Sequence, residues 1–332
     1  MFDRPEAQFA ISAVREAAQL VRRVQAEMVT DALTKGDRSP VTVGDFAAQA
    51  LVAYRMKEAL PGAVLLGEEN AASLRTADGA ETLAAVTKFV ASALPGIDSE
   101  AVCDLIDRGA ADATADYWTL DPIDGTKGFL RGDQYAVALG LVEGGRVAIG
   151  VLGCPDLADG VTGQKGGPGS ILAASRGRGA HLQALDQPDS PWRRLSVSTV
   201  ADPAQTRVLR SVEKAHTSIS GIDRVLDAMG VSGQAIPMDS QAKYAVLAAG
   251  GGEMLVRLLA ADRPDYREKV WDQAAGSIVI EEAGGRVTDL AGRTLDFGQG
   301  RTLAHNRGVL ATNGPLHDAA LAAIAELGYG SK

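Results

Sequence analysis

The sequence predicts an α/β protein built as two halves, residues 1–185 and 186–332. Apolar residues recur at helical spacing in several segments, and short apolar runs bounded by glycine alternate with those segments. The 332-residue chain is also about twice as long as an average domain. An apolar content of 46% and a charged content of 23% are typical of a globular protein with a large core.

The first half opens with two predicted helices. Apolar side chains at helical spacing over residues 5–30 predict one long amphipathic helix, which residues 37–40 end. Thr42 then has the position of an N-cap, with Asp45 three residues later. The second helix should therefore run from there to about residue 60.

A short strand and an insertion follow. AVLLGEEN, residues 63–70, is typical of a buried strand that runs into acidic residues. Residues 71–115 contain two predicted helices joined by LPGIDSE. This acidic segment carries no recognisable motif, so we expect it to be a peripheral insertion.

The rest of the first half is rich in predicted strands. YWTLDPIDGTKGFL, residues 117–130, is an apolar run that ends in two aspartates. AVALGLVEGGRVAIGVLG, residues 136–153, predicts a hairpin that turns at two adjacent glycines. A glycine-rich loop separates it from a second predicted hairpin at residues 171–185.

The second half alternates predicted strands and helices. The strands are RRLSVS (193–198), TRVLRSV (206–212), EMLVRLL (253–259), GRVTDL (285–290) and GVLATN (308–313). The helices lie near residues 220–229, after Trp271, and at PLHDAALAAIAEL (315–327). This order predicts a second α/β unit.

Charge and cysteine content exclude several classes of protein. With 33 basic and 42 acidic residues the net charge is −9, which argues against a partner such as DNA or RNA, because nucleic-acid binding needs a basic face. No apolar run is long enough to span a membrane, and the first 30 residues are too charged for a signal peptide. Cys103 and Cys154 fit no metal-binding spacing. We therefore expect a cytoplasmic protein without disulfides.

Carboxylates gather where predicted strands end or predicted helices begin. They are Asp45, Glu68, Glu69, Asp121, Asp124 and Asp272. Asp121 and Asp124 lie three positions apart, and two like charges so close repel each other unless a cation lies between them. Carboxylate oxygens suit Mg²⁺ or Mn²⁺, whereas no histidine or cysteine cluster indicates zinc.

Each carboxylate also has a structural explanation. Asp45 can complete a capping box, and Asp272 can cap the helix that follows it. Glu68 and Glu69 can lie in a solvated loop, while Asp121 and Asp124 can form a turn with the neighbouring proline and glycine. One fold must nevertheless place all six, and the string D-P-I-D-G-T is unusual enough to favour a metal site.

Three blocks in this order resemble the metal-binding motifs of the inositol monophosphatase superfamily. They are GEE (67–69), WTLDPIDGTKGF (118–129) and VWDQAAGSIVIEEAGGRVTDLAG (270–292). The resemblance implies a five-layer α-β-α-β-α sandwich and a Mg²⁺-dependent, lithium-sensitive phosphatase.

Other segments resemble the 3′(2′),5′-bisphosphate nucleotidases within that superfamily. They are SPVTVGDFAAQALV (39–52), SVEKAHTS (211–218), DSQAKY (239–244) and LDFGQGRTLA (295–304). This likeness implies removal of the 3′-phosphate from adenosine 3′,5′-bisphosphate, a small nucleotide, and often also from its sulfated form.

The resemblance assigns residues to two metal sites. Glu68, Asp121 and the carbonyl of Ile123 would bind one Mg²⁺ ion. Asp121, Asp124 and Asp272 would bind the second, with Asp121 bridging the two ions. The family pattern implies two or three ions, with Mn²⁺ as a possible substitute and Li⁺ as an inhibitor.

The resemblance also implies a catalytic pair and a substrate pocket. Asp45 and Thr126 would orient and activate the attacking water, and Glu69 would support the metal ligands from behind. Residues that would hold the nucleotide and its 5′-phosphate are Thr126, His216, Ser240, Lys243 and Arg257.

Three positions depart from the family pattern. Ala215 stands where glycine is expected, Thr217 where serine is usual, and Gln273 where histidine is common. All three lie on the nucleotide side of the expected site. An inositol phosphate or sugar phosphate phosphatase is therefore the main alternative, and a non-catalytic nucleotide sensor is a more remote one.

Overall fold

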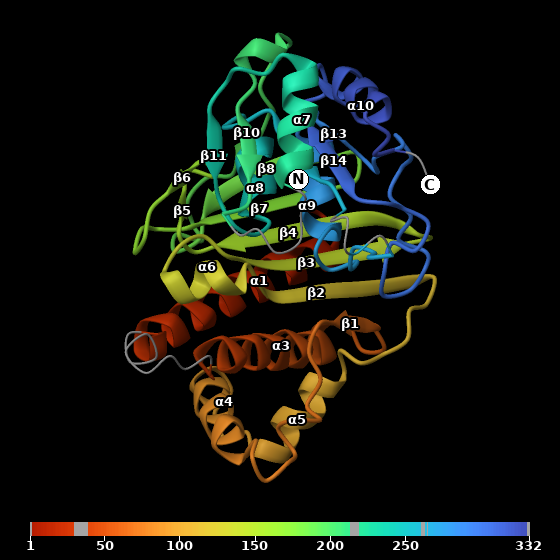
Figure 1. Ribbon diagram of the computed structural model, residues 1–332. Helices are drawn as coiled ribbons and strands as arrows, with labels where there is room; N and C mark the ends of the chain where they lie inside the picture. The colour runs from red at the N-terminus through yellow and green to blue at the C-terminus, as the bar shows by residue number, and fades with distance from the viewer. Residues whose placement is uncertain (1, 30–38, 213–218, 260–262, 264, 331–332) are drawn as a thin grey trace.

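The structure is a computed structural model that describes residues 2–29, 39–212, 219–259, 263 and 265–330 (Figure 1). Its helices are α1 (Pro5–Val24), α3 (Ser39–Ala59), α4 (Ala80–Ala93), α5 (Ser99–Asp107), α6 (Thr126–Arg131), α7 (Ile219–Met229), α8 (Ala242–Ala248), α9 (Ala274–Glu282) and α10 (His317–Glu326). A π-helical turn, η1 (Gln25–Val29), follows α1, and a 3₁₀ turn, η2, spans Pro203–Gln205.

The described strands form two main sheets. The first has the order β1-β2-β3-β4-β7-β8-β9, and the second has the order β11-β10-β12-β14-β13. Strands of the first are β1 (Leu65–Gly67), β2 (Asp116–Asp124), β3 (Ala136–Glu143), β4 (Arg146–Cys154), β7 (Ser170–Ser175), β8 (Gly179–Ala184) and β9 (Arg193–Arg194). Strands of the second are β10 (Val208–Arg210), β11 (Ala235–Pro237), β12 (Met254–Arg257), β13 (Arg286–Thr288) and β14 (Val309–Thr312). A small separate pair joins β5 (Leu157–Ala158) and β6 (Thr162–Gly163).

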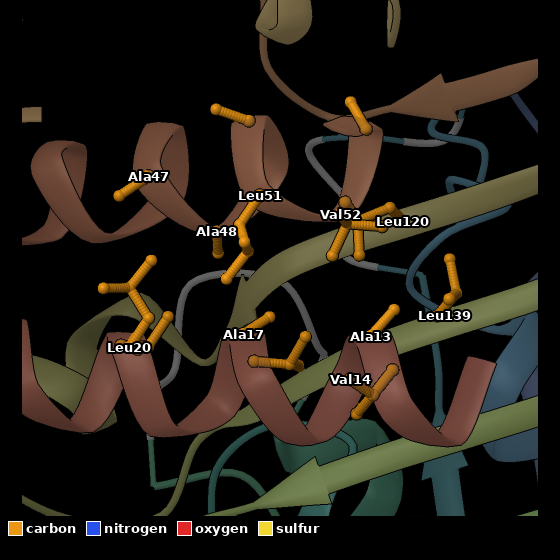
Figure 2. Close-up of a cluster of buried hydrophobic side chains, with 14 of the residues drawn as sticks. Ala13, Val14, Ala17, Leu20, Ala47, Ala48, Leu51, Val52, Leu120 and Leu139 are labelled. Atoms are coloured by element: carbon orange, nitrogen blue, oxygen red, sulfur yellow. The ribbon is translucent and has the colours of Figure 1, made fainter. Parts of the chain in front are cut away.

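Helices α1 and α3 pack together against one face of the first sheet (Figure 1). Small alanines of both helices face each other between larger side chains, and Leu120 and Leu139 reach them from β2 and β3 (Figure 2). Each fully buried leucine or valine contributes about 1.5–3 kcal/mol relative to an exposed one. This core fixes α3 beside the end of β2, where the candidate site lies.

Helices α8 and α9 lie between the two sheets, and α7 and α10 lie beyond the second sheet, giving five layers (Figure 1). Glycines let α9 approach the first sheet closely. A Cβ at Gly150 of β4 would lie 2.4 Å from the Cγ2 atom of Ile278, and one at Gly140 of β3 would lie 3.0 Å from the Cβ atom of Ala274. The close contact holds α9, and the loop before it, against the edge of the site.

Several sequence expectations are confirmed. The first helix is present, although its last turn is π-helical, and the two hairpins appear as β3–β4 and β7–β8. Two helices, α4 and α5, occupy the 71–115 segment and pack on α3. Cys103 and Cys154 are buried and unpaired. Among the described residues, none of the helices is long and apolar enough to cross a bilayer.

Other expectations are wrong. Helix α3 begins at Ser39, so Thr42 lies inside it and is not an N-cap. Proline is tolerated in a first turn because its missing N–H has no partner to lose there, so α3 can begin before Pro40. RRLSVS forms only the two-residue strand β9 at the edge of the first sheet, not a strand of the second. The boundary near residue 185 stays a prediction.

Candidate active site

Asp121 and Asp124 reach the same cavity because β2 contains one extra residue. Asp121 lies opposite Ala138 of β3, and Asp124 lies opposite Ala136, so three steps along β2 match two along β3. In a regular strand, residues three apart point to opposite faces. The irregularity between them brings the second carboxylate back to the face of the first. Both side chains line the cavity.

Glu68 lies beside Asp121 because β1 runs parallel to β2. Gly67 pairs with Leu120, so the residues that follow each of them are neighbours at the ends of the two strands. The backbone N–H of Glu68 donates to the carbonyl of Leu120 at 3.2 Å. Gln49 of α3 fixes the next residue, since its side-chain amide bonds both the carbonyl of Glu69, at 2.7 Å, and its N–H, at 3.1 Å.

Asp272 approaches from the loop before α9. The residue that precedes the helix is Gln273, and no side-chain hydrogen bond caps that end, so Asp272 is not an N-cap. Gln273 is buried, donates to Glu268 at 2.8 Å and accepts a hydrogen bond from the hydroxyl of Tyr244. These bonds hold the loop, and the carboxylate of Asp272 lines the cavity.

The cavity has a volume of about 590 Å³ and combines both signs of charge. Its charged lining residues are Glu68, Asp121, Asp124, Asp239, Asp272, Lys127, Lys243, Arg257 and Lys269. A second cavity of about 570 Å³, between α3 and the α4–α5 connection, contains a single carboxylate among its lining residues. The first cavity is therefore the candidate active site.

The carboxylates of the site repel one another, because they carry the same charge and lie close together. Burial, followed by the charges of Glu68, Asp124, Asp272 and Asp45, raises the pKa of Asp121 well above its usual range. Its Oδ1 atom is buried without a hydrogen-bond partner among the described residues. A cation would relieve both conditions.

Glu68 and Asp45 share this environment. Glu68 is exposed at the cavity, yet the burial of its carboxyl group and the charge of Glu69 raise its pKa to about 7. Burial, followed by the charges of Glu69 and Glu68, raises the pKa of Asp45. The oxygen-rich donor set fits Mg²⁺ or Mn²⁺. Within the described residues, no three such side chains already lie close enough together to hold an ion.

A cationic side of the cavity is built from α8 and β12. Lys243 is buried, and burial lowers its pKa to about 8, although the charge of Asp124 acts in the opposite direction. Arg257 forms an ion pair with the buried Glu268, with Nη2 and Oε2 2.9 Å apart. The backbone N–H of Gln241 donates to Asp124 at 2.7 Å, which links α8 to the acidic side.

Gly125 and Ser240 meet where the two sides join. Both have left-handed backbones, with φ of +93° for Gly125 and +65° for Ser240. A Cβ at residue 125 would lie 2.6 Å from the Cβ of Ser240. Residue 125 must therefore be glycine, and a non-glycine residue held at positive φ, as Ser240 is, is typical of functional sites.

Not all residues expected from the sequence line the cavity. Ile123 and the exposed Thr126, the first residue of α6, do so. Asp45 is buried in α3 behind the lining residues, next to Glu68 and Glu69. His216, like Ala215 and Thr217, lies outside the described residues.

Sequence reasoning missed several members of the site. They are Asp239, Tyr266, Glu268 and Lys269, which line the cavity or, in the case of Glu268, bond to Arg257 and Gln273 behind it. Three of them belong to YREK, directly before the Trp271–Asp272 pair. That closeness to a predicted ligand was the available signal.

Known proteins resemble this chain over nearly its whole length. The profile of the inositol monophosphatase family matches residues 3–329. The chain is 38% identical to a 3′(2′),5′-bisphosphate nucleotidase of Emericella nidulans, over 94% of this chain and 95% of that protein. It is 37% identical to the enzyme of the same name from Schizosaccharomyces pombe, over 92% and 91%.

Solved structures show the same fold. Mycobacterium tuberculosis SuhB superposes with a TM-score of 0.64 at 21% identity, covering 99% of this chain and all of that one. Inositol monophosphatase II of Staphylococcus aureus gives a TM-score of 0.64 at 18% identity, over 98% and 96%. The five-layer α/β sandwich expected from the sequence is thus confirmed.

Proposed function

Because this chain belongs to the inositol monophosphatase family, we propose that it is a metal-dependent phosphatase that converts adenosine 3′,5′-bisphosphate to adenosine 5′-monophosphate. The observation that carries the proposal is one cavity that combines an acidic cluster with two cations, the buried Lys243 and the partly buried Arg257. A substrate with two phosphates needs both: a reaction site for one phosphate and a binding site for the other. Relatives named 3′(2′),5′-bisphosphate nucleotidase are similar to this chain over nearly their whole length, and this similarity supports the choice of substrate.

The acidic side of the cavity would hold the metals. Glu68, Asp121 and the carbonyl of Ile123 would bind one Mg²⁺ ion, and Asp121, Asp124 and Asp272 the other. When bound, the two ions would neutralise the phosphate, lower the pKa of water and stabilise the leaving oxygen. Mn²⁺ would substitute, and Li⁺ would inhibit because a monovalent ion leaves part of the charge uncompensated.

Asp45 and Thr126 would handle the proton of the attacking water. The hydroxyl of Thr126 lies at the cavity and can both donate and accept a hydrogen bond. Asp45 lies in α3, where burial and the neighbouring glutamates raise the pKa of its carboxyl group. A carboxylate with a raised pKa is a better proton acceptor near neutral pH than an ordinary aspartate.

Lys243 and Arg257 would bind the second phosphate. Glu268 orients the guanidinium of Arg257, whose five N–H groups are enough to bind a phosphate as well. Ser240 presents its hydroxyl group at the same cavity, close to Gly125. Binding a remote phosphate places the reacting one accurately, which is worth more to catalysis than to binding alone. A nucleotide whose 5′-phosphate carries a sulfate group would be bound by the same two side chains.

An inositol phosphate or sugar phosphate phosphatase is the second candidate, because the solved structures that share this fold include inositol monophosphatases. A nucleotide sensor without catalysis is disfavoured, because every expected carboxylate and Thr126 is present. A cytoplasmic location stays a prediction.

Replacing Lys243 by methionine tests the proposed binding site for the second phosphate. The change keeps the length of the side chain and removes the charge, so KM for adenosine 3′,5′-bisphosphate should rise at least about 10-fold. KM for adenosine 3′-monophosphate, which lacks the second phosphate, should change much less. Lys57→Met, at an exposed position of α3, is the matched control. An equal rise for both nucleotides would remove the proposed role of Lys243.

A further inference from the structure

Arg301 lies in the segment LDFGQGRTLA, which resembles a family motif but has no place in the proposed chemistry. The residue does not line the cavity. Its guanidinium nevertheless contacts three parts of the chain that are far apart in sequence. Those contacts indicate what the motif does.

Two of the contacts are hydrogen bonds to backbone carbonyls. Arg301 Nη1 donates to the carbonyl of Gly109 at 3.1 Å, and Nη2 donates to the carbonyl of Gly67. The N–H of Gly67 also donates to the carbonyl of Gly109, at 2.9 Å. One side chain thus closes the junction between β1 and the end of the 71–115 segment, one residue before Glu68.

The third contact is with Trp271. The guanidinium carbon lies 4.8 Å from the centre of the indole ring, a favourable cation–π distance. Trp271 directly precedes Asp272. A single planar group therefore touches the residue before Glu68 on one side and the residue before Asp272 on the other.

The backbone around Arg301 strengthens the connection. The N–H of Val270 donates to the carbonyl of Arg301 at 3.2 Å, and the N–H of Leu303 donates to the carbonyl of Glu268 at 2.9 Å. Lys269 and Thr302 form a β-bridge between these bonds. The strand-like segment before Asp272 is therefore held by the same residues that carry the guanidinium.

Gln49 supports the Glu68 turn from the opposite side. Its amide bonds the carbonyls of Glu69 and Ile106, both at 2.7 Å. A Cβ at Gly67 would lie 2.3 Å from the Oε1 atom of Gln49, and a Cβ at Gly109 would lie 2.4 Å from its Nε2 atom. The turn is thus enclosed between Gln49 and Arg301, with no room for it to shift toward the helix.

We propose that Arg301 is a positioning residue that holds the backbone before Glu68 and the backbone before Asp272, from the two halves of the chain, next to each other so that both carboxylates can bind metal. This inference rests on the proposed function, because it takes both carboxylates as metal ligands. Arginine suits the task because its rigid fork donates to two carbonyls while its flat face stacks on an indole. A lysine side chain cannot make both kinds of contact at the same time.

The test measures Mn²⁺ binding to the full-length chain without substrate, by the electron paramagnetic resonance signal of free Mn²⁺. Arg301→Lys and Arg301→Met should each weaken Mn²⁺ binding by at least about 10-fold, the usual effect of losing a residue that orients metal ligands. Arg293→Met, at an exposed arginine of the same half, is the matched control and should leave it unchanged. At saturating Mn²⁺, KM for the nucleotide should stay near the wild-type value in all variants.

Circular dichroism and thermal unfolding of the metal-free variants establish that they are folded, and Arg301→Lys decides the question if Arg301→Met does not fold. Wild-type Mn²⁺ affinity in a folded Arg301 variant would overturn the proposal. A wild-type chain that binds Mn²⁺ but releases no phosphate from any substrate would refute the proposed function and leave the role of Arg301 standing. Absence of Mn²⁺ binding by the wild-type chain would overturn both.

Discussion

Asp121 is buried at the end of β2, beside four other carboxylates whose charges raise its pKa. Its Oδ1 atom lacks a hydrogen-bond partner among the described residues. A buried charge is costly unless an opposite charge compensates it, and the charged neighbours that act on Asp121 are all carboxylates. In the metal-free protein this residue should therefore reduce stability.

Replacing Asp121 by asparagine tests whether this residue lowers the stability of the metal-free protein and is needed for activity. The neutral amide removes the repulsion, so thermal unfolding of metal-free Asp121→Asn should occur at a higher temperature than that of the wild type. Activity should fall by at least about 1,000-fold, which corresponds to about 4 kcal/mol of transition-state stabilisation. Added Mg²⁺ should stabilise the wild type and not the variant. A kcat within a few-fold of the wild-type value would remove Asp121 from the metal site.

His317, far from the cavity, is a second buried ionisable residue with a defined role. Thr288 donates its hydroxyl proton to the carbonyl of Asp289, so it must accept a hydrogen bond from Nε2 of His317, at 2.9 Å. Nδ1 then accepts from the hydroxyl of Thr312, also at 2.9 Å. The network assigns the neutral tautomer with its proton on Nε2. Burial lowers the pKa of His317 to about 4.

This pKa predicts a pH-dependent stability. The folded-state pKa lies below the ordinary value of 6.5, so the contribution is complete above pH 6.5 and is lost as the pH falls toward 4. The shift corresponds to about 3 kcal/mol. Urea unfolding between pH 4 and 7 should show the wild type losing up to this amount relative to His317→Asn. Parallel curves for the two proteins would contradict the assignment.

Among the elements, the turn between β2 and α6 is the most constrained by its surroundings. Gly125 has φ of +93°, and Ser240 of the neighbouring loop fills the space that a side chain would need. Gly62 has nearly the same backbone, with φ of +91°, but nothing lies within 4 Å of a Cβ there. A substitution at Gly62 therefore introduces backbone strain alone, whereas the same substitution at Gly125 introduces backbone strain and a contact with Ser240.

Gly125→Ala and Gly62→Ala form a matched pair. Both should lose about 1–2 kcal/mol of stability, because a Cβ disfavours the left-handed backbone. Only Gly125→Ala should also displace Ser240 and lower kcat/KM, by at least about 10-fold, since a displacement of about 1 Å near reacting groups is costly. Equal activity of the two variants would show that Ser240 is not needed at its observed position.

Sequence patterns predicted the long elements and failed at the short ones. Helix α1 and the hairpin β3–β4 carry many periodic residues or a Gly-Gly turn, so local physics determines them. β11, three residues long and partly exposed, was missed because only its pairing with β10 makes it a strand. The N-cap pattern at Thr42 predicts a later start of α3 than the observed Ser39, because a first turn accommodates Pro40.

At the scale of the whole molecule, the candidate site joins residues from both ends of the chain. The carboxylates of β1 and β2 come from the first part, and Lys243, Arg257 and Asp272 come from the second. Motif resemblance brought these residues together, because composition and periodicity hold no information on such distant contacts. The hydrogen bond from Arg301 to the carbonyl of Gly67 is an example, because the two residues are distant in sequence and no local pattern indicates that they meet.

The net charge of −9 means that the protein as a whole repels an anionic substrate. An anionic substrate approaches an acidic protein, so attraction must be local. The buried Lys243 and the partly buried Arg257 supply part of it, and the metal ions would supply the rest. A phosphatase of this family that lacked either part would bind a doubly phosphorylated nucleotide poorly.

The proposed substrate is best tested by measuring phosphate release in the presence of Mg²⁺ from three substrates in parallel. They are adenosine 3′,5′-bisphosphate, inositol 1-phosphate and inositol 1,4-bisphosphate. We predict a kcat/KM for the nucleotide at least about 100-fold above the others, equivalent to about 2.7 kcal/mol of transition-state discrimination. A preference for either inositol phosphate would contradict the proposed substrate, and absence of phosphate release from all three would contradict the proposed function itself.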